Sequence, residues 1–128
     1  MRLLLDTHTF LWWLAGHRRL SLPARQAIAD EENDVLISAV SAMEVTTKHR
    51  LGKLPGAAAV AHDFASEIAA QGFEELSLTV KDASLAGTLP GLHRDPFDRM
   101  LIAQELKGNL VLVTIESIFD EYGVHRLW

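Results

Sequence analysis

The sequence predicts a layered α/β domain with a parallel sheet, on two observations. Its strongest apolar runs are short and continuous, without the alternation of polar and apolar residues that marks a half-exposed sheet. Segments with helical periodicity separate these runs along the chain. Strands that alternate with helices favour a layered α/β fold with right-handed crossovers.

Three apolar runs predict the central strands, because strands buried on both faces carry few polar residues. These runs are residues 3–5, 35–37 and 110–113. Leu76 and Leu78 indicate a further strand, and residues 124–127 predict an edge strand near the end of the chain.

Six segments between the runs predict helices: 9–15, 23–29, 42–51, 57–70, a short helix that opens at 79–82, and 96–107. Segment 57–70 is rich in alanine and carries apolar residues at steps of four, which is typical of an amphipathic helix. Thr79 and Asp82 fit a capping box. Gly108 is the expected C-cap of the last helix.

The composition is that of an ordinary soluble globular protein. The 128 residues, 48% apolar and 23% charged, predict a single domain over residues 1–128. No apolar run approaches the roughly 20 residues that cross a bilayer, and Asp6 interrupts the first run, so we expect neither a membrane span nor a signal peptide. The lack of cysteine excludes disulfides and thiolate zinc sites and favours a cytoplasmic location.

Carboxylates lie at four junctions between the predicted strands and helices. Asp6 closes the first run, Glu44 follows the second, Asp95 and Asp98 open the last helix, and Glu116 follows the run 110–113. In a parallel α/β fold these junctions meet along one edge of the sheet, where ligands bind. Gathered anions repel one another unless a cation lies between them, so the pattern predicts a divalent metal and a metal-dependent enzyme.

Helix capping is the alternative explanation for each acid taken alone. Ser41 and Glu44 fit the capping box S-x-x-E, Asp95 fits an N-cap followed by proline, and Asp6 fits a cap after the first strand. Two observations favour the metal site. Asp98 heads the apolar stripe of its helix, where a charged group needs a partner, and the four acids share one end of their elements.

Other known site patterns are absent or weak. No H-E-x-x-H pair, phosphate-binding loop or dinucleotide fingerprint is present, which argues against a zinc hydrolase or a nucleotide-binding fold. The net charge of −5 argues against a nucleic-acid coat protein, although not against a nuclease, because a metal supplies local positive charge. Basic clusters at 17–19, 48–53 and 93–99 lie beside the helices that carry the acids. Each suits a solvated helix end, and together they suit a phosphate backbone.

Four blocks together resemble the PIN-domain ribonuclease family, and in particular its VapC-like toxin branch. They are MRLLLDTHTFLWWL, ISAVSAMEVTTKHRLGKL, HRDPFDRMLIAQEL and LVLVTIESIFDEYGV, in the family's order and over nearly the whole chain. The resemblance implies a three-layer α/β/α domain with a central parallel sheet. It also implies a Mg²⁺- or Mn²⁺-dependent endoribonuclease that acts on RNA, with a small antitoxin and a homodimer as expected assemblies.

The resemblance also implies an acidic quartet. Its catalytic members are Asp6, Glu44, Asp98 and Glu116, of which Asp6, Glu44 and Asp98 hold the metal. Two positions depart from the family pattern. Glu116 stands where aspartate is usual, which leaves the number of metals open, and Asp95 is a possible substitute ligand. Glu105 stands where a small residue is usual, and we expect it to alter the pocket rim.

The block from Phe10 to Leu14 is apolar on all sides of the predicted helix. A helix buries only one face on its own sheet, so some of these side chains are left for another surface. Aromatic residues often anchor interfaces, so we expect Trp12 or Trp13 to contact a second copy or an antitoxin. The alternative is that the helix is buried between the sheet and the next helix.

Two other functions stay open at this point. A receiver-like signalling domain is also doubly wound and acidic around Mg²⁺, but it needs an acidic pair after the first strand and a lysine near the last strand. In this chain Asp6 is a single acid, and Thr114 leads to Ile115 and Glu116 without a lysine. A PIN-fold binding module with impaired catalysis is the other alternative, and the departure from aspartate at Glu116 keeps it open.

Overall fold

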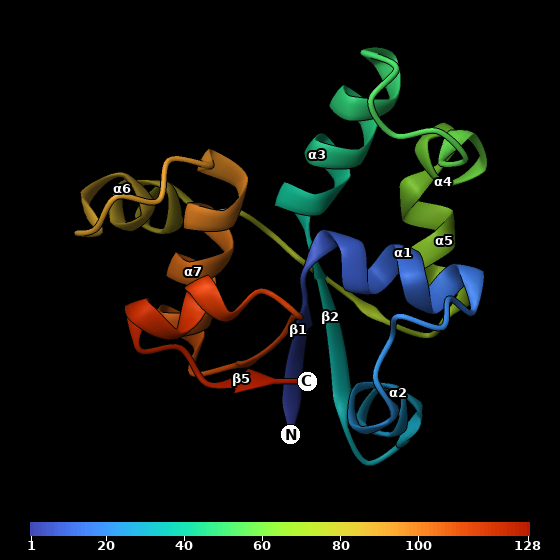
Figure 1. Cartoon of the computed structure of the whole chain (residues 1–128), viewed down its shortest axis with the longest axis horizontal. Coiled ribbons are helices and arrows are strands. Elements are labelled where there is room, and N and C mark those ends of the chain that lie inside the picture. The colour runs from blue at the N-terminus through green and yellow to red at the C-terminus, as the bar shows by residue number, and fades with distance from the viewer.

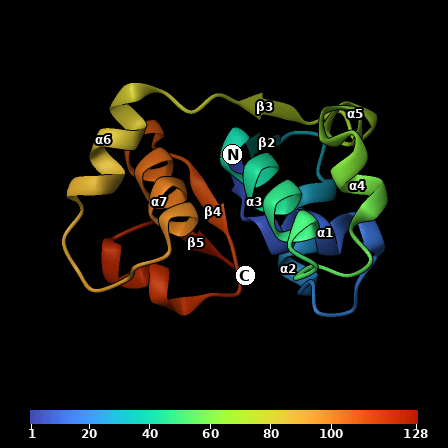
Figure 2. The ribbon, with the colours of Figure 1, turned by 90° about the horizontal axis from the view of Figure 1, so that it is seen from above.

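The computed structural model describes all 128 residues as a five-stranded parallel sheet between two layers of helices (Figure 2). The strands are β1 (Arg2–Leu5), β2 (Asp34–Ser38), β3 (Glu74–Leu76), β4 (Val111–Val113) and β5 (Arg126–Leu127). Their order in the sheet is β3-β2-β1-β4-β5, and every neighbouring pair is parallel. The predicted three-layer α/β/α architecture is confirmed.

The helices are α1 (Thr7–Ala15), α2 (Leu22–Ala29), α3 (Ala39–Arg50), α4 (Ala58–His62), α5 (Phe64–Ala70), α6 (Val80–Thr88) and α7 (Pro96–Gly108), with the 3-10 helix η1 (Ser117–Tyr122) after β4. In Figure 1, α1, α2, α4 and α5 lie on one side of β1 and β2, while α6 and α7 lie on the other. No helix is long and apolar enough to span a bilayer.

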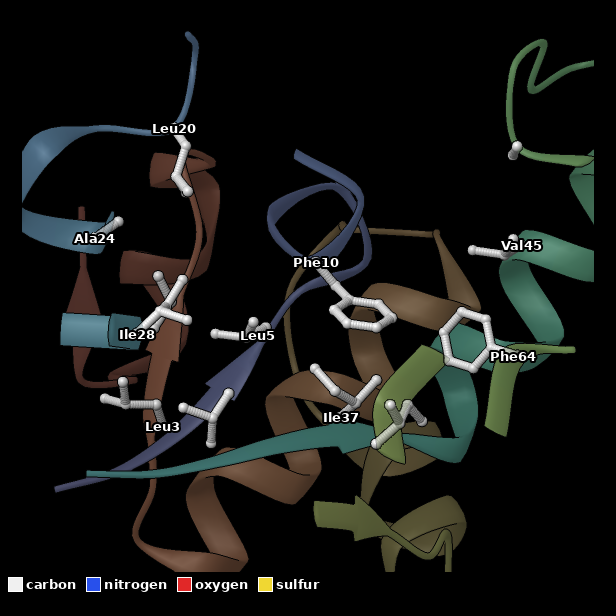
Figure 3. Close-up of a cluster of buried hydrophobic side chains, with 13 residues drawn as sticks. Leu3, Leu5, Phe10, Leu20, Ala24, Ile28, Ile37, Val45 and Phe64 are labelled. Atoms are coloured by element: carbon white, nitrogen blue, oxygen red, sulfur yellow. The ribbon is translucent and has the colours of Figure 1, made fainter. Parts of the chain in front are cut away.

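Each face of the sheet buries its own apolar cluster. Leu3 and Leu5 point to the cluster that contains Phe10 of α1, Ile28 of α2 and Phe64 of α5 (Figure 3). The opposite face holds a smaller cluster, formed by Leu4, Val40, Leu101, Ile102, Leu110, Leu112, Phe119 and Val124. This explains the continuous apolar runs of the sequence, because both sets of alternating side chains are buried.

The order of the strands also excludes one of the two alternative functions. Receiver domains have the order 2-1-3-4-5, whereas this sheet has the order 3-2-1-4-5. The receiver-like alternative is therefore wrong. The reversal of strand order falls at β1, which has β2 on one side and β4 on the other.

Three local predictions need correction. The expected single helix over 57–70 is two helices, because Asp63 leaves the helical conformation (φ −149°, ψ 80°) and caps α5 by accepting a hydrogen bond from the Ser66 amide. Strand β3 occupies Glu74–Leu76 and excludes Leu78. Gly108 is the last residue of α7, and Asn109 takes the left-handed C-cap conformation (φ 51°, ψ 50°).

Glu105 is buried on α7 far from the first turn of that helix, and the expectation that it lines the pocket rim is wrong. Its Oε1 accepts a hydrogen bond from the backbone N–H of His125 at 3.1 Å, whereas its Oε2 has no partner. Burial raises the pKa of this carboxyl, although the His125 amide and the His125 ring oppose the shift. An ionised Glu105 therefore reduces the stability of the folded chain.

The substitution Glu105→Gln should stabilise the protein at high pH and have little effect at low pH. Because the folded pKa of Glu105 lies above its unfolded value, the wild type loses stability as the pH rises through that folded pKa, and glutamine does not. We expect a gain of about 1 kcal/mol at pH 8 relative to pH 4, which lies below the unfolded pKa of glutamate, measured by urea unfolding. The exposed Glu121→Gln is the control. Equal stability of Glu105→Gln and wild type at pH 8 would contradict this account.

Candidate active site

The carboxyl edge of the sheet brings the predicted acids together. Leu5 pairs with Ile37 of β2 and with Val113 of β4, so the residues that follow each strand lie side by side. Asp6 follows β1 directly, and its amide donates to the Val113 carbonyl at 3.1 Å. The first turns of α1, α3 and α7 lie at this same end of the sheet (Figure 1). This edge, where the strand order reverses, is where open parallel sheets bind ligands.

A pocket of about 180 Å³ opens at this edge, and no apolar residue lines it. Its lining residues are Asp6, Thr7, His8, Glu44, Lys48, Asp95, Asp98 and Glu116. All four residues of the predicted quartet are present, together with Asp95. The structure thus brings five carboxylates to one place from four separate segments of the chain.

Asp6 is buried and serves as the N-cap of α1. Its Oδ1 accepts a hydrogen bond from the Thr9 amide at 2.7 Å, which confirms the capping role that the sequence predicts. Burial raises the pKa of Asp6, while hydrogen bonds from Thr114 and Thr9 and the nearby His8 oppose the shift. The cap therefore orients a carboxylate whose negative charge is costly at this position.

Glu44 is a buried acid inside a helix, and the predicted capping box at Ser41 is wrong. The helix begins three residues earlier than that box requires, because Ser38 caps α3 by accepting a hydrogen bond from the Val40 amide at 3.0 Å. Both oxygens of Glu44 have partners: Thr7 Oγ1 donates to Oε1 at 2.6 Å, and Lys48 Nζ donates to Oε2. Glu44 thus has no capping function that accounts for its burial.

Asp95 and Asp98 divide two roles at the start of α7. Asp95 is the N-cap, and its Oδ1 accepts from the amides of Phe97 and Asp98 at 2.9 and 3.1 Å. Asp98 points to His93, whose Nε2 lies 2.8 Å from Asp98 Oδ2. Burial raises the pKa of Asp98 to about 6; His93 opposes this shift, whereas Asp95 and Glu44 add to it.

Glu116 lies at the margin of the pocket. It follows β4 by three residues, and its side chain is exposed and makes no hydrogen bond. Its amide donates to Thr114 Oγ1 at 3.0 Å, which fixes the backbone but leaves the carboxylate free.

The oxygen donors of the pocket suit a hard divalent cation, although the acidic side chains line the pocket without converging on a single binding point. No three Asp, Glu or His side chains lie close enough to share a metal ion. Asp6 bonds a backbone amide, Glu44 bonds Lys48, and Asp98 bonds His93. Carboxylate oxygens are nevertheless the ligands that Mg²⁺ and Mn²⁺ prefer. The raised pKa values of Asp6 and Asp98 indicate negative charge that a cation would stabilise.

Sequence reasoning missed the partners of these acids. Lys48 belongs to a cluster that the sequence assigns to a solvated helix end, but the i, i+4 spacing from Glu44 is a signal for the observed ion pair. Arg99 belongs to another such cluster, yet its guanidinium donates to the carbonyls of Ala86, Leu89 and His93 and holds the loop before α7. It is not available for a phosphate backbone.

Comparison with known proteins gives a family and a fold. The family model of the PIN domain matches residues 3–124. No curated protein sequence matches the chain significantly.

Three solved structures illustrate the likeness in fold. VapBC2 from Rickettsia felis, bound to a DNA fragment from its promoter, has 17% identity and a TM-score of 0.70, with 99% of this chain and 98% of that chain covered. VapC20 from Mycobacterium tuberculosis, described as a toxin that cleaves the sarcin-ricin loop, has 19% identity and a TM-score of 0.63, with 95% of each chain covered. A toxin–antitoxin complex from Klebsiella pneumoniae has 19% identity and a TM-score of 0.62, with 98% and 95% covered.

A divalent ion should raise the melting temperature of this protein if the acidic pocket binds it. A ligand at about 100 times its Kd adds about 2.7 kcal/mol when it binds only the folded state, so we expect a rise of several degrees with Mg²⁺ or Mn²⁺. The rise should vanish in Asp6→Asn/Asp98→Asn, which removes two pocket charges. The measurement is thermal unfolding with metal and with EDTA. Glu31→Gln/Glu32→Gln removes two exposed charges elsewhere and should behave as wild type. An equal rise in both double variants would place the metal outside the pocket.

Proposed function

Because the chain belongs to the PIN domain family, we propose that it is a metal-dependent endoribonuclease and the toxin of a toxin–antitoxin pair. The single observation that carries this proposal is the pocket that Asp6, Glu44, Asp98 and Glu116 line together, at the edge where the strand order reverses. The family match and the two apolar clusters on one sheet support a single PIN-like domain over residues 1–128.

We assign Mg²⁺ or Mn²⁺ binding to Asp6, Glu44 and Asp98, directly or through water. Such an ion lowers the pKa of a bound water and neutralises charge on the scissile phosphate. The chain orients each ligand separately: the Thr9 amide holds Asp6, the Thr7 hydroxyl holds Glu44, and His93 holds Asp98. These contacts limit the rotation of the three carboxylates, which supports their role as ligands.

Glu116 is the acid that we assign to the attacking water. Its carboxylate is exposed and makes no hydrogen bond, so it is free to accept one from a water at the pocket mouth. Hydrolysis then forms one P–O bond to the water oxygen and breaks the P–O bond to the leaving ribose oxygen. The extra methylene of glutamate, compared with aspartate, gives the carboxylate a longer reach from the loop after β4.

The choice of RNA and of an antitoxin rests on the PIN domain family and on the neighbours in fold. One neighbour is a toxin that cleaves the sarcin-ricin loop, and another is a toxin–antitoxin complex. Lys48 lines the pocket, and Arg50 lies two residues further along α3, so this helix carries positive charge that suits an RNA backbone.

A second pocket is the proposed docking site for the antitoxin. It has a volume of about 440 Å³, lies between α1 and α4, and is lined mainly by apolar residues: Leu11, Trp12, Leu14, Leu54, Pro55 and Val60 are among them. Trp12 is half-buried and lines this pocket, whereas Trp13 turns to Phe73 and donates to Gln71 Oε1 at 2.9 Å. Of the two tryptophans, Trp12 is therefore the better candidate for a contact with a partner. A homodimer is a further expected assembly, which ultracentrifugation of the purified chain tests.

Replacement of Asp6 by asparagine should abolish RNA cleavage without unfolding the protein. Asparagine is also a good N-cap, so α1 keeps its start, and the loss of one buried charge should raise the melting temperature in EDTA. We expect cleavage with Mn²⁺ to fall by at least about 100-fold, because loss of groups that only support a ligand already costs 10- to 100-fold. Glu121→Gln, an exposed acid away from the pocket, should keep full activity. If the wild type binds Mn²⁺ but cleaves no RNA, the chain is instead a PIN-fold binding module.

Replacement of Trp12 by alanine should weaken binding of the antitoxin. The candidate partner is a small protein encoded beside this chain, and the measurement is its Kd for the purified toxin. Interface hot spots contribute at least about 2 kcal/mol, so we expect the Kd to rise about 30-fold or more. Val80→Ala, which shortens an exposed apolar side chain on α6, is the matched control. An unchanged Kd in Trp12→Ala would contradict the proposal that the antitoxin docks in the pocket between α1 and α4.

A further inference from the structure

A single lysine stands among the five carboxylates of the acidic pocket. Lys48 lies one helical turn after Glu44 on α3, and its ammonium donates to Glu44 Oε2. The side chain of Lys48 is 31% exposed and that of Glu44 is 5% exposed, so the ion pair has one buried and one reachable partner. Arg99, the nearest basic residue on α7, is bound to backbone carbonyls and does not line the pocket.

Acids on two elements act on this lysine. Helix α3 packs against α7, whose N-cap is Asp95 and whose first turn carries Asp98. Burial lowers the pKa of the Lys48 ammonium, but the hydrogen bond to Glu44 and the charges of Glu44, Asp95 and Asp98 outweigh this effect and raise the pKa above its ordinary value. Lys48 is therefore positively charged and attracted to the centre of the pocket.

Both oxygens of Glu44 are occupied in this arrangement. Thr7 donates to Oε1 and Lys48 donates to Oε2, so no carboxylate oxygen of Glu44 is without a hydrogen bond. The Thr7 contact involves a neutral hydroxyl and leaves a lone pair on Oε1 for another ligand. The Lys48 contact instead places a full positive charge where a divalent cation would bind, and like charges repel.

We propose that Lys48 is the resident cation of the metal-free pocket, that it leaves Glu44 when a divalent ion enters, and that its ammonium then binds a phosphate of the RNA. This inference rests on the proposed function, because it assumes a metal at Glu44 and a phosphodiester substrate. Lys48 is thus a substrate-binding residue whose ammonium forms an ion pair with the metal ligand Glu44 until the metal binds.

Side-chain chemistry supports the two positions of the ammonium. Lysine has a flexible four-carbon stem with a compact charge at its tip, and it binds phosphate as a point charge. A partly exposed ion pair contributes at most about 1 kcal/mol, so its exchange for a metal bond is easily reversible. The net charge of the pocket stays nearer to zero in both states, first through Lys48 and then through the metal.

The first experiment measures metal affinity without RNA. Calorimetric titration of Mn²⁺ compares wild type, Lys48→Gln and Lys81→Gln, an exposed lysine on α6 whose loss changes the net charge equally. Because Lys48→Gln removes the competing cation, we expect its Kd for Mn²⁺ to fall about fivefold, whereas Lys81→Gln should match wild type. A Kd in Lys48→Gln equal to or higher than that of wild type would overturn the proposal.

The second experiment tests the substrate role on a single-stranded RNA that the wild type cleaves. In Lys48→Gln at saturating Mn²⁺ we expect a higher KM, and a plot of log(kcat/KM) against log[salt] that is less steep by about 0.7, the value for one lost phosphate contact. Lys48→Arg keeps the charge and should restore the wild-type slope. An unchanged slope in Lys48→Gln would contradict the proposed contact between Lys48 and a phosphate. If the wild type binds Mn²⁺ but cleaves no RNA, the proposed activity fails, and the metal titration still decides whether Lys48 competes for Glu44.

Discussion

The burial of like charges at one edge of the sheet is the constraint on which this structure depends. Parallel strands end together, so the acids that follow them lie close to one another, and the burial of Asp6 and Asp98 raises the pKa of both. Each of these carboxylates has a different kind of donor: a backbone amide for the buried Asp6, a hydroxyl and an ammonium for the buried Glu44, and an imidazole for the half-buried Asp98. The sheet supplies the apolar support for this arrangement, because its strands are packed on both faces.

Features that depend on neighbouring residues can be predicted from the sequence. The caps at Asp6 and Asp95 and the capping box at Thr79 involve residues two or three positions apart, and all three form as predicted. The central strands are predictable too, because burial on both faces leaves a continuous apolar run. Membership of the PIN domain family is recognisable because the four sequence blocks occur in the family's order.

Features that depend on competition between local signals are predicted less well. Ser41 and Glu44 satisfy a capping motif, but Ser38 lies at the end of β2 and caps the helix first. The alanine-rich segment has a helical period throughout, but the side chain of Asp63 bonds to Ser66 and begins a new helix. The partners of the acids are harder still, because the Thr7–Glu44 contact joins residues 37 positions apart and no pattern in one sequence specifies it.

That difference in sequence separation divides the pocket into two parts that form under different conditions. The contacts of Asp98 with His93 and of Asp95 with the first turn of α7 lie within one short segment, so they need little more than the helix itself. The contact of Thr7 with Glu44 exists only when β1 and β2 have paired, which requires the closure of a long loop. A partial opening of the β1–β2 pair would therefore separate Asp6 and Glu44 while leaving the α7 half of the pocket in place. Substitutions far from the pocket that loosen this pairing would reduce its affinity for a cation before they reduce the helical content of the protein.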